Sequence, residues 1–187
     1  MKKYFLGFFP DQKNNHKIRK IVGEVGRVFD GQDIDIRWAN PDNFHVTLMY
    51  LGTNLNFLQK YFRFKKINNL IIPKFNIQLN ECELGVSRSY KGLVYLNLKE
   101  GGEELRNLVF SLRSFLSNND VSNYIPHITL GRVSKDLTSE EFRNLASDIK
   151  NVNSQLNITD ISFTSENLCL VEDDGEKYSY LKKFPTA

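Results

Sequence analysis

The alternation of apolar and polar residues predicts both strands and helices in the first quarter of the chain. Nearly every residue of segment 4–9 is apolar, which predicts a strand buried on both faces. Asp11 then offers an N-cap for a helix whose apolar residues recur at helical spacing. The Gly- and Asp-rich stretch 30–33 ends this helix, and segment 34–38 has the pattern of a second strand.

The rest of the chain predicts one series of elements twice. The first series is a segment containing His45, a helix with Leu55, Leu58 and Phe62 at helical spacing, an alternating strand around Ile77, and a strand at 93–98. A clear amphipathic helix over 105–116 follows. The second series is a segment containing His127, a helix that opens on a capping-box sequence at Thr138, an alternating strand at Leu156 and Ile158, and a strand at 168–171. The sequence therefore contains an internal duplication.

The spacing of this duplication predicts the architecture. His45 and His127 are 82 residues apart, and Ile77 and Ile158 are 81 apart. A period this long does not suit a solenoid of short repeats. We expect an α+β fold with two pseudo-symmetric lobes, each an antiparallel sheet flanked by helices, with a cleft between them. No linker-like sequence separates the halves, so residues 1–187 are expected to form a single bilobal domain.

Composition narrows the class of protein without identifying a function. The chain has 187 residues, of which 41% are hydrophobic and 25% charged, which is ordinary for a globular protein with one core. The net charge of +3 is compatible with an anionic partner, but it is far from the basic footprint of a general nucleic-acid binder. On charge alone, a mixed, solvated surface is the favoured explanation.

The cysteines and the apolar runs bear on location. Cys82 and Cys169 are the only cysteines, without metal-type spacing, which argues against a disulfide scaffold or a zinc site and suits a reducing compartment. The apolar stretch near the N-terminus is shorter than a signal-peptide core, and no run approaches the ~20 residues that span a bilayer. We expect a cytoplasmic monomer without a membrane segment.

Two matching segments carry the candidate chemistry: Phe44-His45-Val46-Thr47-Leu48 and Pro126-His127-Ile128-Thr129-Leu130. Two of the three histidines of the chain lie in this one context. Residues two apart on a strand share a face, so each segment presents an imidazole and a hydroxyl on one side. Phe44, Val46, Leu48 and Tyr50 are expected to face the core. A lone His-x-Thr is best explained as a structural histidine, but packing gives no reason to repeat both polar positions.

This inventory favours acid–base catalysis over two alternatives. A metal site needs three or four ligands, and no further Cys, His, Asp or Glu lies at ligand spacing. A nucleophilic triad needs an activated Ser or Cys, and no Gly-x-Ser-x-Gly turn is present. A pair of imidazoles can take a proton from water and give one to a leaving oxygen, while Thr47 and Thr129 hold a phosphoryl centre between them. The expected site contains no metal and needs no cofactor.

Arg132 is a further candidate because guanidinium matches two phosphate oxygens at once. Strict alternation would place Arg132 on the back of the strand with Ile128 and Leu130. It reaches the site only if the strand ends or bulges at Gly131, which a glycine permits.

The paired motifs resemble those of the 2H phosphoesterases, and most closely the RNA 2′,3′-cyclic phosphodiesterase branch, also called 2′-5′ RNA ligase-like. The shared features are the apolar first strand, Arg37-Trp38, the motif from Pro41 to Gly52, the motif from Pro126 to Arg132, and the C-terminal Tyr178-Ser179-Tyr180-Leu181 and Phe184-Pro185. The resemblance covers essentially the whole chain.

The resemblance implies metal-independent hydrolysis of a ribose 2′,3′-cyclic phosphate at an RNA end, which leaves a 2′-phosphate. It implies that His45 is the proton donor to the 3′-oxygen and that His127 is the proton acceptor for water. The sequence itself does not fix this polarity. Tyr124, just before the second motif, is a candidate stacking platform for a base, although a core tyrosine is equally compatible. The polar connection 87–92 does not identify base contacts.

Two alternatives stay open at this point. A sister phosphoesterase that acts on 2′-5′ oligonucleotides or small cyclic nucleotides would need the same four catalytic residues. A non-catalytic module that binds RNA ends predicts that the His45→Ala and His127→Ala proteins still do all that the wild type does.

Overall fold

The computed structural model describes residues 1–86, 91–116 and 123–187. Its helices are α1 (Gln12–Gly31), α2 (Phe57–Asn68), α3 (Gly102–Leu116) and α4 (Ser139–Asn153), with short 3-10 helices η1 (Pro41–Asn43) and η2 (Ile158–Asp160). Its strands are β1 (Lys3–Phe8), β2 (Ile36–Trp38), β3 (Val46–Thr53), β4 (Asn76–Leu84), β5 (Leu93–Glu100), β6 (Ile128–Val133), β7 (Ser162–Thr164), β8 (Asn167–Asp173) and β9 (Tyr178–Pro185). Most of the polar connection 87–92 lies outside the described residues.

The strands form one curled antiparallel sheet that consists of two halves. The order β7-β4-β5-β6-β3-β1-β8-β9 runs across it, and β2 pairs with β6 beside this path. One half holds β6, β5, β4 and β7, and the other holds β3, β1, β8 and β9. They meet where β3 pairs with β6 through Val46 and Ile128. The predicted α+β fold with two related antiparallel lobes is confirmed.

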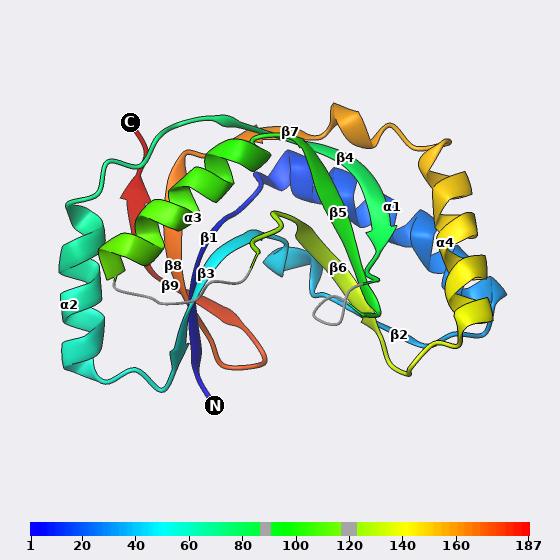
Figure 1. The fold of residues 1–187 in the computed structure, drawn as a ribbon, viewed down its shortest axis with the longest axis horizontal. Helices are drawn as coiled ribbons and strands as arrows, with labels where there is room; N and C mark the ends of the chain where they lie inside the picture. The colour runs from blue at the N-terminus through cyan, green and yellow to red at the C-terminus, as the bar shows by residue number, and fades with distance from the viewer. Residues whose placement is uncertain (87–90, 117–122) are drawn as a thin grey trace.

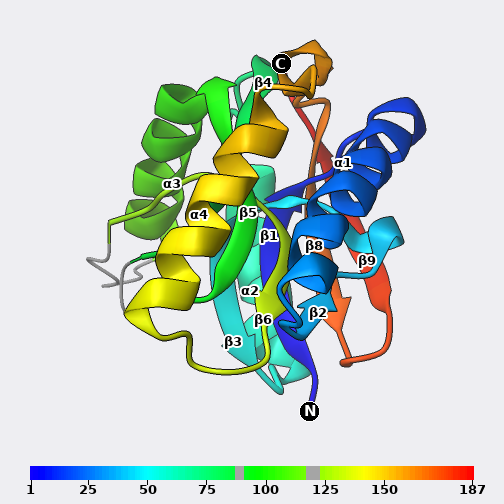
Figure 2. The ribbon, with the colours of Figure 1, turned by 90° about the vertical axis from the view of Figure 1, so that its right-hand side faces the viewer.

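The helices cover the two ends of the molecule in pairs. Helix α2 packs against α3, and α1 packs against α4. Figure 1 shows α2 at the opposite end of the molecule from α4, and Figure 2 shows α4 and α1 from that second end. The lobes are thus flanked by helices as expected.

Each lobe combines strands from both halves of the sequence. After the first motif strand and α2, the chain enters β4, which pairs with β5 in the lobe of β6. After the second motif strand and α4, it reaches β8, which pairs with β1 in the lobe of β3. The two halves of the sequence therefore repeat the same order of elements. Each half contributes a strand to the lobe of the other half, β4 to the lobe of β6 and β8 to the lobe of β3.

Capping residues fix the first turns of α1 and α4 as predicted. The Asp11 side chain accepts a hydrogen bond from the Asn14 amide at the start of α1. Thr138 and Glu141 form a reciprocal capping box at the start of α4. Such caps satisfy amide groups that have no partner within the helix.

The strand predicted at Leu156 and Ile158 is wrong, because these residues lie in and just before η2. Asn157 and Asp160 favour a turn over an extended backbone. Ile158 and Ile161 are both buried. Their three-residue spacing matches one turn of a 3-10 helix, so both side chains reach the core. In the second series of elements, the strand that corresponds to β4 is β7. The predicted equivalence of Ile77 and Ile158 is therefore wrong.

Two further elements differ from the sequence pattern. Helix α2 forms, but Leu58 and Phe62 are exposed and Leu55 precedes the helix, while Ile67 is buried. Strand β9 was not predicted, because it is an edge strand with half of its residues exposed, and Lys182 and Lys183 interrupt its apolar pattern. No helix in the described part of the chain has the length and apolar character needed to cross a membrane.

Candidate active site

The two motifs meet at the centre of the sheet. The one residue pair that joins β3 to β6 consists of Val46 and Ile128, the middle residues of the two His-x-Thr triplets. Each histidine is the residue directly before its strand, whereas the sequence predicted it on the strand itself. Val46 and Ile128 are fully buried, whereas both His and both Thr are half-buried. Two related triplets therefore lie antiparallel across a pseudo-twofold axis.

Both imidazoles are fixed in the same way. The Nδ1 of His45 lies 2.6 Å from the carbonyl oxygen of Asn43, and the Nδ1 of His127 lies 2.7 Å from that of Ile125. A carbonyl only accepts, so Nδ1 carries the proton in each neutral ring. The Nε2 atoms are then the ones available for proton transfer. On His45, this atom lies 2.8 Å from the Thr47 hydroxyl.

Aromatic residues surround His45, and no pattern in the sequence indicated them. Phe5 and Phe9 stack on the imidazole with ring centroids at 4.7 and 5.3 Å, and Tyr178 meets it edge-on at 5.5 Å. Phe5 comes from β1, Phe9 follows that strand directly, and Tyr178 begins β9. Their approach depends on strand pairing across the sheet, which no local pattern in the sequence reports.

His127 has a different support. Tyr95 of β5 meets its ring edge-on, with centroids 5.3 Å apart. The Tyr95 hydroxyl donates a 2.5 Å hydrogen bond to the Glu83 carboxylate, which also accepts from the Asn97 amide. Tyr95 is opposite Thr129 in the sheet, so this network lies beside the second motif.

Burial makes both histidines weaker bases. Loss of hydration lowers the pKa of His45 to about 4, although its hydrogen bond to Asn43 opposes the shift. A positive charge on His127 lowers the pKa of His45 further, so the two rings lie within electrostatic reach. Burial also lowers the pKa of His127, against the opposing effect of the Ile125 carbonyl. At neutral pH the free protein holds His45 neutral.

A bulge follows each motif at its leucine. In the first, Gly7 and Leu6 pair with Thr47 and Met49, so Leu48 is the extra residue. In the second, Tyr95 and Val94 pair with Thr129 and Gly131, so Leu130 is extra. A bulge shifts the alternation of the residues after it.

The bulges turn two later residues onto the face of the histidines. Arg132 is exposed, as is Tyr50, which was predicted to face the core. Tyr50 is opposite Phe5, which stacks on His45, and Arg132 is opposite Leu93, two residues from Tyr95. The sequence required a strand end or a bulge at Gly131 for Arg132 to leave the back face, and the bulge lies one residue earlier, at Leu130. The prediction that Tyr50 faces the core is wrong.

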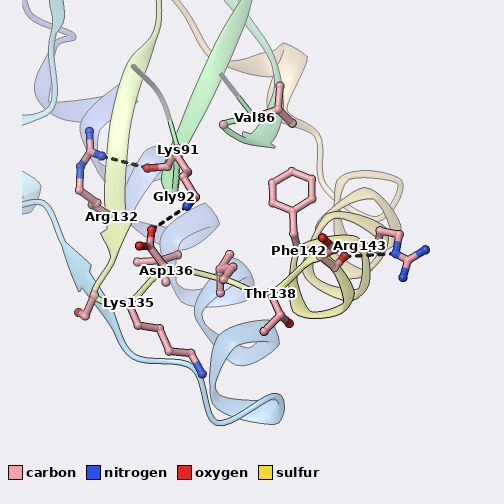
Figure 3. Close-up of a pocket in the computed structure, with 14 residues that line it drawn as sticks. Val86, Lys91, Gly92, Arg132, Lys135, Asp136, Thr138, Phe142 and Arg143 are labelled. Atoms are coloured by element: carbon pink, nitrogen blue, oxygen red, sulfur yellow. Dashed lines mark hydrogen bonds and ion pairs between the residues drawn. The ribbon is translucent and has the colours of Figure 1, made fainter. Parts of the chain in front are cut away.

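Arg132 lies at the edge of a pocket of about 760 Å³ beyond the second motif. Its guanidinium donates a 3.0 Å hydrogen bond to the carbonyl oxygen of Lys91. Figure 3 shows Arg132 and Lys91 on one side of this pocket and Phe142 on the other.

Tyr124 links the two motifs. Its hydroxyl donates a 2.9 Å hydrogen bond to the carbonyl oxygen of Thr47, and its side chain packs partly against the core. Both features suit a structural tyrosine, and the stacking of a base on Tyr124 stays a prediction.

The structure offers little for a metal ion. Within residues 1–86, 91–116 and 123–187, no three His, Cys, Asp or Glu side chains are grouped so that they could hold one.

Comparisons with known proteins find one curated relative by sequence and several solved structures with a similar fold. No protein-family model matches the chain. A curated relative, the RNA 2′,3′-cyclic phosphodiesterase of Aquifex aeolicus (strain VF5), is 27% identical over 138 residues, which cover 69% of this chain and 69% of the relative. The apo crystal structure of E. coli LigT covers 100% of this chain and 98% of its own, with a TM-score of 0.71 and 18% identity.

The chain has the LigT fold. The crystal structure of TT0787 from Thermus thermophilus agrees, with a TM-score of 0.67 and 16% identity over 98% of this chain and 97% of its own. E. coli LigT has also been crystallised in complexes with phosphate and with 3′-AMP. The resemblance of the chain to the 2H phosphoesterases is confirmed.

Proposed function

We propose that this protein is a phosphodiesterase that hydrolyses RNA 2′,3′-cyclic phosphate ends to 2′-phosphates, with His45 and His127 as the acid–base pair. The observation that carries the proposal is the pairing of Val46 with Ile128, because it sets two His-x-Thr triplets opposite each other. The name of the Aquifex relative and the LigT fold support the same class of reaction.

The proposed reaction is a single displacement at phosphorus. His127 Nε2 removes a proton from water as the water oxygen bonds to phosphorus. The bond from phosphorus to the 3′-oxygen breaks, and His45 Nε2 gives that oxygen a proton. The products are a free 3′-hydroxyl and a 2′-phosphate. Such proton transfers each contribute about 10²–10⁴-fold to a rate.

Thr47 and Thr129 would stabilise the charge that develops on the phosphoryl oxygens, and Arg132 would bind the substrate. Each threonine hydroxyl is two residues from its histidine and shares its face. Donors aimed at a developing oxyanion are among the largest contributors to catalysis. The bulge at Leu130 supports the role of Arg132 in substrate binding, because it shifts the alternation of the residues that follow.

The proposed role of His45 as proton donor requires that its imidazole be protonated when the substrate is bound. A pKa of about 4 leaves this ring mostly neutral at pH 7 in the free protein, whereas a proton donor must be charged. The negative charge of a bound cyclic phosphate favours the imidazolium and raises the pKa of both rings. His45 therefore acts as the acid only if substrate binding supplies this shift.

The decisive experiment measures turnover of nucleoside 2′,3′-cyclic phosphates and of a short RNA with a cyclic-phosphate end. We expect activity that survives a chelator and has a bell-shaped pH profile. His45→Ala and His127→Ala should each lower kcat by at least about 10²-fold. Lys65→Ala, on the exposed surface of α2, is the matched control and should behave as wild type.

Other results would select another function. Activity lost with the chelator would exclude the two-imidazole mechanism. Faster turnover of 2′-5′ oligoadenylates or of small cyclic nucleotides would assign the same residues to a sister phosphoesterase. RNA-end binding without turnover, retained in both alanine variants, would identify a binding module.

A further inference from the structure

A cavity lies beyond the second motif. We call it the α4 pocket: the cavity of about 760 Å³ between the end of β6, the turn that leads into α4, and the adjoining ends of β4 and β5. Its volume is in the range of small-molecule and nucleotide sites. Neither histidine and neither motif threonine lines it, so none of the groups proposed for proton transfer or charge stabilisation lies in it.

The polar lining of the α4 pocket favours an anionic ligand. Lys91, Arg132 and Lys135 line it together with one carboxylate, Asp136. Lys91 pairs with Asp136 at 2.8 Å, and Lys135 pairs with Glu141 at 2.8 Å, both on the surface. Exposed pairs are weak, so a phosphate can compete for these ammonium groups at little cost. Arg132 donates to a backbone carbonyl and keeps its full charge.

An aromatic ring faces these cations. Phe142, in the first turns of α4, is half-buried and only partly covered by the core. Figure 3 shows its ring turned from the helix into the pocket, across from Lys91 and Gly92. Aromatic rings combined with cations along a groove are the means by which proteins bind single-stranded nucleic acid.

Arg132 joins this pocket to the catalytic residues. It lies five residues after His127 on β6, which corresponds to about 16 Å of strand. Successive nucleotides of one strand advance about 3.4 Å when stacked as in a double helix, so a few nucleotides cover that distance. The bulge at Leu130 keeps Arg132 and His127 on one face, so an RNA strand can follow it.

We propose that the α4 pocket binds the RNA chain on the 5′ side of the reacting terminal ribose. A base stacks on Phe142, and backbone phosphates contact Lys91 and Lys135. This proposal rests on the proposed function for the position of the reacting end. On this proposal the substrate is an RNA strand, and a nucleoside 2′,3′-cyclic phosphate alone is a poorer substrate.

The kinetic test compares kcat/KM for a hexanucleotide with a cyclic-phosphate end and for the corresponding nucleoside 2′,3′-cyclic phosphate. In the wild type the hexanucleotide should be favoured by about 10-fold or more. Phe142→Leu keeps apolar packing but removes the stacking face, so this preference should fall by about 5- to 100-fold. Phe142→Trp should retain it. A wild-type preference near one would overturn the proposal.

The binding test is independent of turnover. Fluorescence anisotropy measures the Kd of a labelled RNA hexanucleotide that ends in a 2′-phosphate, at several salt concentrations. Phe142→Leu should raise Kd, and Lys135→Ala should reduce the slope of log Kd against log salt by about 0.7. Lys65→Ala removes the same charge from α2, at the other end of the molecule, and should change neither value.

The two tests separate the two proposals. If no cyclic phosphate is hydrolysed but Phe142→Leu and Lys135→Ala weaken RNA binding, the pocket is supported and the catalytic function is wrong. If hydrolysis occurs but both variants bind RNA as the wild type does, the pocket proposal is wrong and the catalytic one stands.

Discussion

His45 is the residue whose environment constrains the mechanism most strongly. Phe5 and Phe9 stack on it, Asn43 fixes its Nδ1, and burial lowers its pKa to about 4. The resemblance to the 2H phosphoesterases assigns the proton donor to this residue, while the free protein holds it neutral. The ring is therefore either charged by the substrate or serves as the base.

A substrate analogue with sulfur in place of the 3′-oxygen decides between these roles. A thiolate leaves without a proton, so this substrate does not need the acid. If His45 is the donor, His45→Ala should recover most of its lost rate with the analogue, and His127→Ala should stay impaired. Single-turnover rates of both variants with both substrates provide the measurement. Recovery by His127→Ala alone would reverse the polarity.

The low pKa of His45 also makes folding stability depend on pH. The unfolded chain binds a proton at this residue below about pH 6.5, but the folded protein binds it only below about pH 4. The free energy of unfolding therefore falls as the pH drops from 6.5 to 4, by about 3 kcal/mol from this residue. In His45→Asn, which keeps a donor for the Asn43 carbonyl, that share of the loss should disappear.

Urea unfolding of the wild type and of His45→Asn at pH 7 and pH 4 measures the difference. The carboxylates titrate in both proteins, so their contribution cancels in the comparison. An equal loss of stability in the two proteins would show that the ring is hydrated in solution and that its pKa is close to normal.

At this scale the sequence predicted the motif residues but not their neighbours. His45, Thr47, His127 and Thr129 stand out because their pattern repeats. Phe5 and Tyr178 reach His45 only through the pairing of β1 with β3 and β8, and of β8 with β9. Contacts of this kind depend on register, which a single sequence specifies weakly.

At the scale of elements, the paired bulges decide which residues lie on the face of the histidines. Alternation predicted Tyr50 in the core, and it left Arg132 on the back face unless the strand was irregular. An extra residue ahead of each of them, Leu48 before Tyr50 and Leu130 before Arg132, turns both side chains to the other face. Neither leucine differs in type from an ordinary strand residue. Gly131 permits the second bulge, whereas no local property of the sequence indicates the first.

Close approach of β1 to the first bulge requires a glycine at position 7. A Cβ atom on Gly7 would lie 2.8 Å from the Val46 carbonyl oxygen and 3.4 Å from Cδ2 of His45. Gly7→Ala should therefore push β1 away from β3 and displace the imidazole. We expect a loss of about 1–3 kcal/mol in stability and a larger loss of kcat than of substrate binding.

Gly23→Ala is the matched control, because a Cβ atom at this position in α1 meets nothing within 4 Å. Alanine is favoured over glycine inside a helix by up to about 1 kcal/mol, so this variant should be slightly more stable and fully active. Chemical denaturation and steady-state kinetics of the two variants test both statements. A Gly7→Ala protein with wild-type activity would show that His45 tolerates movement of β1.

At the scale of the whole molecule, the exchange of strands connects the lobes. The sequence predicted two similar units, and each would be self-contained if its strands stayed together. Instead β4 and β8 each join the sheet of the other half. The order of elements is visible in a sequence, whereas the partner of a strand is decided by long-range packing.

We propose on this basis that residues 1–187 unfold as one cooperative unit. Buried residues of both half-sheets, such as Leu6 of β1 and Leu96 of β5, belong to the same hydrophobic cluster. Trp38 is the only tryptophan, and it pairs with Gly131 of β6. Its fluorescence therefore reports on one lobe, while far-ultraviolet circular dichroism reports on all elements.

Both probes should give the same denaturation midpoint in the wild type. Leu6→Ala removes a buried side chain from the lobe without Trp38, at a cost of about 2–5 kcal/mol. In a cooperative molecule this change lowers the Trp38 midpoint as much as the dichroism midpoint. If the Trp38 midpoint stays at its wild-type value while the dichroism transition splits, the lobes fold separately. The pairing of β3 with β6 would then be an interface between two domains, and the two motifs would meet only when these domains dock.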